Sequence, residues 1–143
     1  MKVKDIMTKS VAYINPESSV TEAAQMMQMH NVGSIPVCDK NGVIGMVTDR
    51  DIVVRNVAHG TDPHKTPVKN VMTSQVTTVT PDMDVNQVSS IMATNQIRRI
   101  PVVADNILVG IVALGDLATN SRFDTEASDV LTDISRPSRP EKI

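Results

Sequence analysis

The stretch SIPVCDKNGVIGMVTDRD (Ser34–Asp51) consists of two apolar segments on either side of a Lys-Asn-Gly turn, followed by a polar Thr-Asp-Arg-Asp. Apolar runs that flank an Asn-Gly turn are typical of a β-hairpin. We therefore predict strands at Ile35–Cys38 and Val43–Val47, and a helix that begins near Asp49. A similar stretch, RIPVVADNILVGIVALGD (Arg99–Asp116), occurs later in the chain.

This second stretch belongs to a longer internal repeat. VKDIMT (Val3–Thr8) returns as VKNVMT (Val68–Thr73), and every later match keeps the same offset, including Pro16 with Pro81. Chance does not hold Pro, Gly and Asp in register over such a span. We therefore infer that one unit has been duplicated.

Each copy predicts the same order of elements. A leading turn runs into a strand, Val11–Ile14 or Val76–Val79, and a proline then breaks the chain. A helix follows, and Ser19 with Glu22 has the spacing of a capping box. The other expected elements are helices at Val20–His30 and Val85–Gln96, strands at Ile100–Val103 and Leu108–Val112, and a last helix that begins near Leu114. The predicted fold class is thus α+β (or α/β), with two β-α-β-β-α repeats.

One copy alone would have a thin core, so we expect the two halves to pack about a pseudo-twofold axis. The expected domains are residues 1–58 and 68–120, joined by a Gly- and Pro-containing linker at residues 59–67. The polar stretch 121–143 is expected to be partly disordered, with one or two helical turns at Glu126–Ile134.

Composition argues against several classes of function. The net charge is −2, and the chain has one Tyr, one Phe and no Trp, which disfavours a nucleic-acid partner. No apolar run approaches the ~20 residues of a membrane span, and no apolar secretory segment is visible. The single cysteine, Cys38, has no partner for an internal disulfide. We expect a cytoplasmic protein without a membrane partner.

The repeated unit resembles the CBS domain, a regulatory module named after cystathionine β-synthase. The matching motifs are IMT near the start of each copy, HNVGSIPV or NQIRRIPV after the helix, and GMVTDRDI or GIVALGDL at the close. The resemblance covers about Val3 to Asn120. It implies tandem CBS domains with clefts that in many members hold an adenosine derivative, and pairing of two such modules into a homodimer.

The closing motif supplies the first candidate site residues. Helix N-termini attract anions, the Thr48 hydroxyl can bond a phosphate, and a carboxylate one turn later can accept from two ribose hydroxyls. The resemblance assigns these roles to Thr48 and Asp51, although local sequence also fits a plain capping box. The copy has Ala113 instead of threonine yet keeps Asp116, so we favour a ribose role for both aspartates. The second cleft is expected to bind more weakly, to take a ligand without that phosphate, or to be empty.

Further candidates come from the resemblance and from charge. Arginines present a bidentate fork to phosphate, apolar strand residues can line a base, and threonines precede each strand. The alternatives are solvated arginines, ordinary core residues and residues that end a turn. These candidates are Arg50, Arg98 and Arg99 for phosphate, Ile35, Pro36, Ile100 and Pro101 for the base, and Thr8 and Thr73 beside the ligand.

No catalytic set or phosphate loop is present in the sequence, and His59 and His64 are interpreted as polar linker residues rather than metal ligands. We therefore expect a non-enzymatic regulator that binds AMP, ADP, ATP or S-adenosylmethionine, requires no cofactor or metal, and acts on an unknown protein. Two alternatives remain open. One is a ligand-free interaction or dimerisation module, and the other is a nucleic-acid-associated CBS protein.

Overall fold

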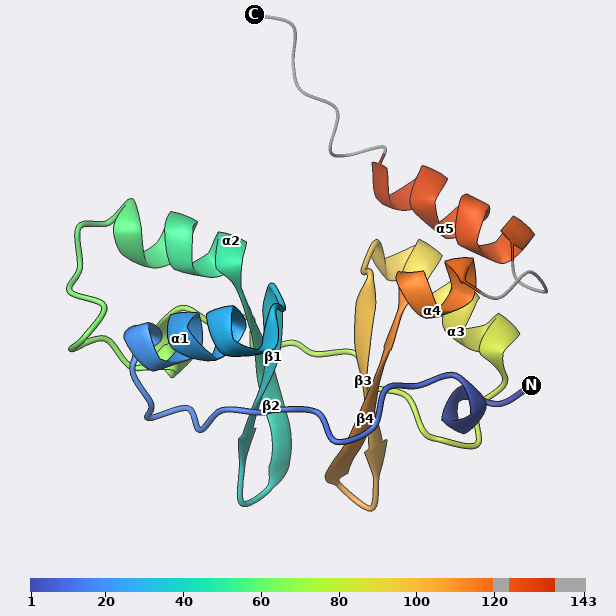
Figure 1. Ribbon diagram of the computed structural model, residues 1–143, viewed down its shortest axis with the longest axis horizontal. Helices are drawn as coiled ribbons and strands as arrows, with labels where there is room; N and C mark the ends of the chain where they lie inside the picture. Colours follow the sequence, from blue (N-terminus) through green and yellow to red (C-terminus); the bar gives the residue numbers. More distant parts are fainter. Residues whose placement is uncertain (120–123, 136–143) are drawn as a thin grey trace, which may run out of the picture. The chain divides into compact units, whose positions relative to one another are not determined.

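The computed structural model describes residues 1–119 and 124–135, which fall into two compact units (Figure 1). The amino unit is Ala12–Val76. The carboxy unit combines Met1–Val11 with the described residues from Thr77 onward. The chain thus starts in the carboxy unit, leaves it after Val11 and returns at Thr77. No helix among the described residues is long and apolar enough to cross a membrane.

The amino unit contains a helix, a β-hairpin and a second, shorter helix (Figure 1). Its elements are α1 (Val20–His30), β1 (Ser34–Asp39), β2 (Gly42–Thr48), α2 (Asp49–Ile52), the π-helical turn η2 (Val53–Val57) that continues α2, and the 3-10 turn η3 (Val68–Asn70).

The carboxy unit repeats this order and adds a last helix (Figure 1). Its elements are the 3-10 turn η1 (Val3–Asp5), α3 (Val85–Asn95), β3 (Arg99–Ala104), β4 (Ile107–Ala113), α4 (Leu114–Ala118) and α5 (Asp124–Ser135).

Both predicted hairpins form. Ile35 pairs with Val47 in the first, and Ile100 pairs with Val112 in the second. All four side chains are buried, at 1% exposure or less, so the residues that pair across each hairpin also contribute to its core.

The helix bounds follow from their caps. The Ser19 hydroxyl accepts from the Glu22 amide at 3.1 Å and starts α1 as predicted. The helix predicted to reach Gln96 ends at Asn95, because Gln96 takes a left-handed conformation with φ of 56°.

The strands predicted at Val11–Ile14 and Val76–Val79 do not form, which corrects the sequence prediction. Only single parallel bridges remain, from Ile14 to Val37 and from Val79 to Val102. In a parallel ladder, the next residue to donate a backbone hydrogen bond would lie two positions after Ile14 or Val79. That residue is Pro16 or Pro81, and proline has no N–H to give.

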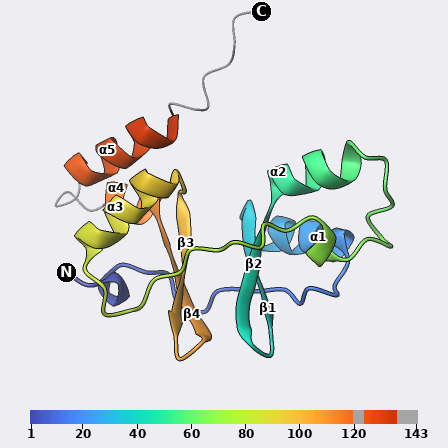
Figure 2. The same ribbon diagram turned by 180° about the vertical axis from the view of Figure 1, so that it is seen from behind.

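The two leading segments are exchanged between the repeats. Thr8 exchanges backbone hydrogen bonds with Ile111 at 2.8 and 3.0 Å, and Thr73 does the same with Met46 at 2.8 and 2.9 Å. The stretch after η3 therefore runs beside β2 (Figure 2). VKDIMT of the first repeat packs in the carboxy unit, and VKNVMT of the second packs in the amino unit.

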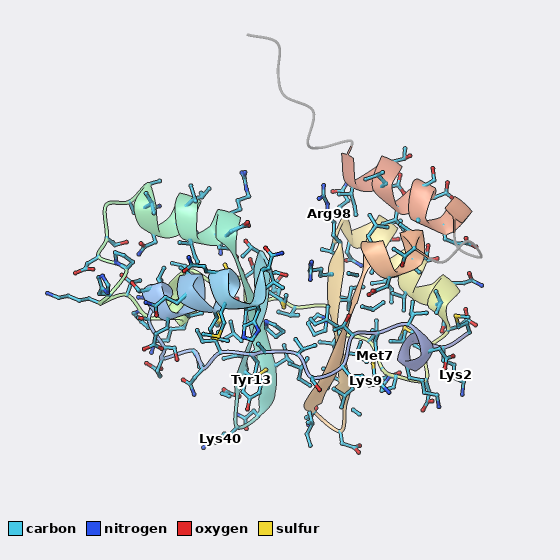
Figure 3. The ribbon with its side chains drawn as sticks, in the orientation of Figure 1. Lys2, Met7, Lys9, Tyr13, Lys40 and Arg98 are labelled. Atoms are coloured by element: carbon cyan, nitrogen blue, oxygen red, sulfur yellow. The ribbon has the colours of Figure 1, made fainter. Side chains whose placement is uncertain are left out.

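Ion pairs hold the exchanged segments at equivalent places. Lys4 lies 3.3 Å from Asp82, and Lys69 lies 2.8 Å from Glu17. Lys2, labelled in Figure 3, adds a longer contact to Asp82 at 3.6 Å. The expected domains at 1–58 and 68–120 thus follow the sequence repeats, whereas the compact units cut across them.

The exchange explains the glycine of the closing motif. A Cβ on Gly45 would lie 2.6 Å from the Met72 sulfur and 2.9 Å from the Thr73 carbonyl. A Cβ on Gly110 would lie 2.7 Å from the sulfur of Met7, which Figure 3 labels. Only glycine lets the incoming backbone approach β2 and β4 this closely.

Helix α5 is longer than the one or two turns predicted, at 12 residues. It lies beside α3 and α4 (Figures 1 and 2), and Ala127, Val130 and Ile134 join the core that contains Met92 and Leu117. Within the stretch 121–143, which was expected to be partly disordered, residues 124–135 form α5, and residues 121–123 and 136–143 lie outside the described residues.

Candidate functional site

The turn from β2 into α2 is a complete capping box. The Asp51 amide donates to the Thr48 hydroxyl at 3.0 Å, and the Thr48 amide donates to Oδ2 of Asp51 at 3.0 Å. The capping interpretation is therefore confirmed in the amino unit. The box also orients both side chains, because each is held by the backbone of the other.

The turn from β4 into α4 keeps half of this box. Ala113 has no side-chain acceptor, but its amide donates to Oδ2 of Asp116 at 2.7 Å. The sequence argument that Asp116 loses its capping partner when Thr becomes Ala is therefore wrong. Asp116 accepts a hydrogen bond from the backbone amide of residue 113. Every residue type except proline has this amide, so the bond does not need a threonine.

Each aspartate uses Oδ2 for this bond, which leaves Oδ1. Within the described residues, no hydrogen bond to Oδ1 of Asp116 is found, and Oδ1 of Asp51 has only Arg55 Nε nearby, at 3.9 Å. That distance exceeds a direct hydrogen bond. Both carboxylates can therefore accept hydrogen bonds from a further group such as a hydroxyl.

The two aspartates differ in their electrostatic surroundings. Burial raises the pKa of Asp116, whereas the hydrogen bond from Ala113 and the charge of Arg99 pull that pKa down by less. The side chain of Asp51 is only 12% exposed, and its cationic neighbour, Arg55, lies on the same helix. The nearby arginine thus differs between the two aspartates: it is Arg55 for Asp51 and Arg99 for Asp116.

The structure divides the predicted site residues into two groups, one per unit. The exchange places Thr73 with the first hairpin and Thr8 with the second. The amino unit holds Ile35, Pro36, Thr48, Arg50, Asp51 and Thr73, and the carboxy unit holds Thr8, Arg98, Arg99, Ile100, Pro101 and Asp116.

The apolar candidates are core residues of their hairpins. Ile35 and Ile100 are 1% and 0% exposed, and Pro36 and Pro101 are buried as well. The carbonyl of Pro36 accepts the Ile14 amide at 3.0 Å. Their contact with a base stays a prediction, since packing already accounts for their apolar character.

The arginine candidates are exposed at the start of a strand or helix. The carbonyl of Arg98, labelled in Figure 3, accepts from the first amide of α4, that of Leu114, at 2.8 Å. Arg50 lies in α2. Their side chains are accessible to an anion, and phosphate binding by them stays a prediction.

Sequence reasoning missed two residues near Asp51. Ser34 pairs with Thr48 across the hairpin, and its Oγ is buried without a hydrogen-bond partner among the described residues. Arg55 donates from Nη1 to the carbonyls of Val71 and Met72, each at 3.0 Å. The spacing of Asp51 and Arg55 at i and i+4 signalled their contact, but no local signal pointed to Ser34.

The residue types also bear on metal binding. Within residues 1–119 and 124–135 no group of three or more His, Cys, Asp and Glu side chains lies close enough to hold a metal ion. Cys38 is a strand residue whose thiol pKa is raised by burial and by the charge of Asp39.

These features define a class of protein, a duplicated α+β module with an acid-bearing strand-to-helix turn in each copy. Comparison with known families gives the same result. The CBS domain family matches residues 3–56 and 68–122, and the chain belongs to that family. The predicted α+β fold of tandem CBS domains is confirmed.

Relatives extend over nearly the whole chain. The CBS domain-containing protein YhcV of Bacillus subtilis (strain 168) is 48% identical over 133 residues, which cover 93% of this chain and 94% of that protein. The crystal structure of the CBS domain protein TA0289 from Thermoplasma acidophilum is similar, with a TM-score of 0.81, 29% identity and coverage of 95% of this chain and 77% of that one.

A third similar protein was solved with metal. The crystal structure of Hypoxic Response Protein I contains two coordinated zinc ions; its TM-score is 0.77 at 33% identity, with 84% of this chain and 98% of that chain covered. Hypoxic response protein 1 of Mycobacterium tuberculosis (strain ATCC 25618 / H37Rv) is 34% identical over 116 residues, 80% of this chain and 81% of that protein.

Proposed function

We propose that this CBS pair is a cytoplasmic, homodimeric regulator that binds an adenosine-type ligand (AMP, ADP, ATP or S-adenosylmethionine) and catalyses no reaction. One observation carries the proposal. In both repeats an aspartate near the start of a helix commits Oδ2 to a backbone amide and leaves Oδ1 to accept from a hydroxyl. A ribose offers two adjacent hydroxyls to such an oxygen.

The amino unit offers the fuller set of groups. The Thr48 hydroxyl accepts from the Asp51 amide, so its own proton stays free to donate to a phosphate. The buried Ser34 hydroxyl has no partner among the described residues, and an orphaned buried hydroxyl is a common sign of a missing water or ligand. We therefore rank this site above that of Asp116.

A ligand-free interaction module is the second candidate, and a different observation favours it. Capping alone accounts for Thr48 and Asp51, while Val53, Val54 and Val57 expose 57%, 44% and 63% of their surface. Exposed valines at helical spacing suit a surface that another protein covers.

Thermal melting of the purified protein with AMP, ADP, ATP and S-adenosylmethionine tests the proposal. A ligand at a hundredfold over its Kd adds about 2.7 kcal/mol to the free energy of unfolding, which raises the melting midpoint by several degrees. The variants are Asp51→Asn and Asp116→Asn, since an asparagine oxygen still accepts the capping amide. Asp129→Asn, in an exposed position on α5, is the control.

A shift that disappears in Asp51→Asn and persists in Asp116→Asn supports the proposal and its ranking of the sites. Loss only in Asp116→Asn reverses the ranking. No shift with any of the four ligands refutes the proposal, and the ligand-free module then becomes the better account.

A further inference from the structure

We propose that Arg55 is a positioning residue of the amino-unit site, which couples Asp51 to the exchanged segment Val71–Thr73. Through this residue, a ligand held by Asp51 stabilises the segment of the second repeat that lies on the first. The inference rests on the proposed function. It goes beyond it by naming the side chain that links ligand and segment.

The contacts of Arg55 are the basis of this inference. Its Nη1 donates to two successive carbonyls, those of Val71 and Met72, each at 3.0 Å. Its Nε lies 3.9 Å from Oδ1 of Asp51, the oxygen that the capping box leaves unused. One guanidinium therefore touches both the candidate ligand carboxylate and the exchanged segment.

The segment that Arg55 reaches is fixed on its other side by β2. Thr73 exchanges two backbone hydrogen bonds with Met46, and the Met72 sulfur lies against Gly45. Arg55 lies in η2, the continuation of α2. Arg55 therefore links α2, which carries Asp51, to the segment Val71–Thr73 of the second repeat. That segment is in turn hydrogen-bonded to β2, the strand before α2.

The geometry predicts how a ligand uses this link. At 3.9 Å the contact with Asp51 is an ion pair without a full hydrogen bond, so Oδ1 can still accept from a ribose hydroxyl. A carboxylate held by both the Thr48 amide and a neighbouring cation needs little further ordering to bind. Without Arg55, ligand binding would have to order both Asp51 and the segment.

The second repeat has no arginine at the equivalent position of the sequence. The repeat offset places Asn120 opposite Arg55 in the sequence, and the carboxylate of Asp116 instead feels the charge of Arg99 from β3. The coupling is therefore a property of the amino unit. It also gives a reason why the two sites would respond differently to one ligand.

The test is a double-mutant cycle on the full chain, with AMP, ADP, ATP and S-adenosylmethionine titrated separately by calorimetry. The variants are Arg55→Gln, Asp51→Asn and their combination, with Arg50→Gln as a control for an exposed arginine of the preceding helix. We expect Arg55→Gln to weaken binding about fivefold, as the loss of an ion pair worth about 1 kcal/mol would. In the Asp51→Asn background, where calorimetry at higher ligand concentration measures the residual binding, the same change should have no further effect.

Amide hydrogen exchange gives a second measurement that does not depend on affinity. The Thr73 amide, bonded to the Met46 carbonyl at 2.8 Å, should exchange more slowly when ligand is added to the wild-type protein. In Arg55→Gln the ligand should no longer slow it, whereas in Arg50→Gln the slowing should persist. Should Arg55→Gln fail to fold, Arg55→Lys replaces it, because lysine keeps the charge but not the fork.

The outcomes separate the two proposals. If the wild-type protein binds a probe and Arg55→Gln binds it equally well, the role of Arg55 is refuted and the proposed function stands. Losses that add in the double variant also refute the coupling. If the wild-type protein binds none of the four probes, both proposals fall together.

Discussion

The groups that cap the two strand-to-helix turns, after β2 and after β4, differ by one hydroxyl. In the amino unit Thr48 and Asp51 exchange two hydrogen bonds, and in the carboxy unit Ala113 and Asp116 make one. The shared bond runs from the N-cap amide to the aspartate, so the aspartate alone is enough to start the helix. The threonine is therefore not needed to start this helix, since α4 begins without one.

The repeats also differ on their outer helices. Helix α5 buries Ala127, Val130 and Ile134 in the carboxy unit, whereas η2 of the amino unit exposes Val53 and Val57. The hairpins are alike in the two copies, whereas the outer helices differ. The experiments below test how far the two copies are equivalent.

The largest expected effect lies where the copies are most alike. Gly45→Ala and Gly110→Ala should each lower the free energy of unfolding by about 2–3 kcal/mol, because the new methyl group meets a backbone carbonyl. Urea denaturation measures the change. Gly115→Ala in α4, where nothing lies within 4 Å of the added Cβ, is the control and should be neutral or slightly stabilising. A small effect at only one of the two strand glycines would show that the exchanged segments pack unequally.

The next effect concerns the helix that only one unit has. Val130→Ala should cost about 2 kcal/mol, because Val130 is 0% exposed in the core of the carboxy unit. Leu131→Ala is the matched control on the same helix, since Leu131 is 51% exposed. Equal stability of the two variants in thermal melts would contradict the packing of α5 described above.

A smaller effect follows from the missing hydroxyl. Thr48→Ala should destabilise the protein by about 1 kcal/mol, because the Asp51 amide loses its acceptor. Ala113→Thr should make the second turn like the first and add stability of a similar size. If the phosphate role of the threonine holds, ligand binding by Asp116 should strengthen in Ala113→Thr, which calorimetry can measure. Stabilisation without any change in binding would leave the hydroxyl with a capping role only.

The smallest effect is the titration of Asp116. Its folded-state pKa lies above the ordinary value of 3.8 because of burial. The folded protein therefore holds this proton more tightly than the unfolded chain does, and the contribution of Asp116 to stability falls as pH rises from 3.8 through the folded-state pKa. NMR titration of the carboxyl carbon measures that pKa.

Arg99→Gln sharpens the same measurement. The arginine charge favours the carboxylate, so its removal should raise the pKa of Asp116 further. A pKa that moves down, or that does not respond to Arg99, would contradict the electrostatic account of this site.

Much of the fold could be predicted from the sequence because it depends on local patterns. Apolar runs on either side of a turn predicted the hairpins, and Ser19 marked the start of α1. The exchange of the leading segments could not be predicted, because VKDIMT and VKNVMT are almost the same sequence and would suit either hairpin. Apolar residues at Val11–Ile14 and Val76–Val79 indicate strands, but the proline two residues after Ile14 or Val79 cannot donate the next hydrogen bond of a parallel ladder, so only single bridges form.

The site was predicted only in part, for a similar reason. Thr48 and Asp51 are close in sequence, so their contact follows from helix geometry. Arg55 lies one turn further on, but its bonds to Val71 and Met72 join distant parts of the chain. The ribose role of Asp116 was inferred because Ala113 lacks the threonine hydroxyl. The structure shows that Asp116 still caps the helix, since it accepts from the backbone amide of Ala113.

The exchanged segments also suggest how such a chain could have arisen. A polypeptide with a single repeat would carry a leading segment that pairs, in the present protein, with the hairpin of the other repeat. Two such polypeptides could form a dimer by exchanging these segments, and the fraction of dimer would depend on their concentration. Joining them end to end makes the trade intramolecular, where the effective concentration is in the millimolar range for short flexible linkers. Residues 59–67 join the two copies in the sequence and so keep this exchange within one molecule.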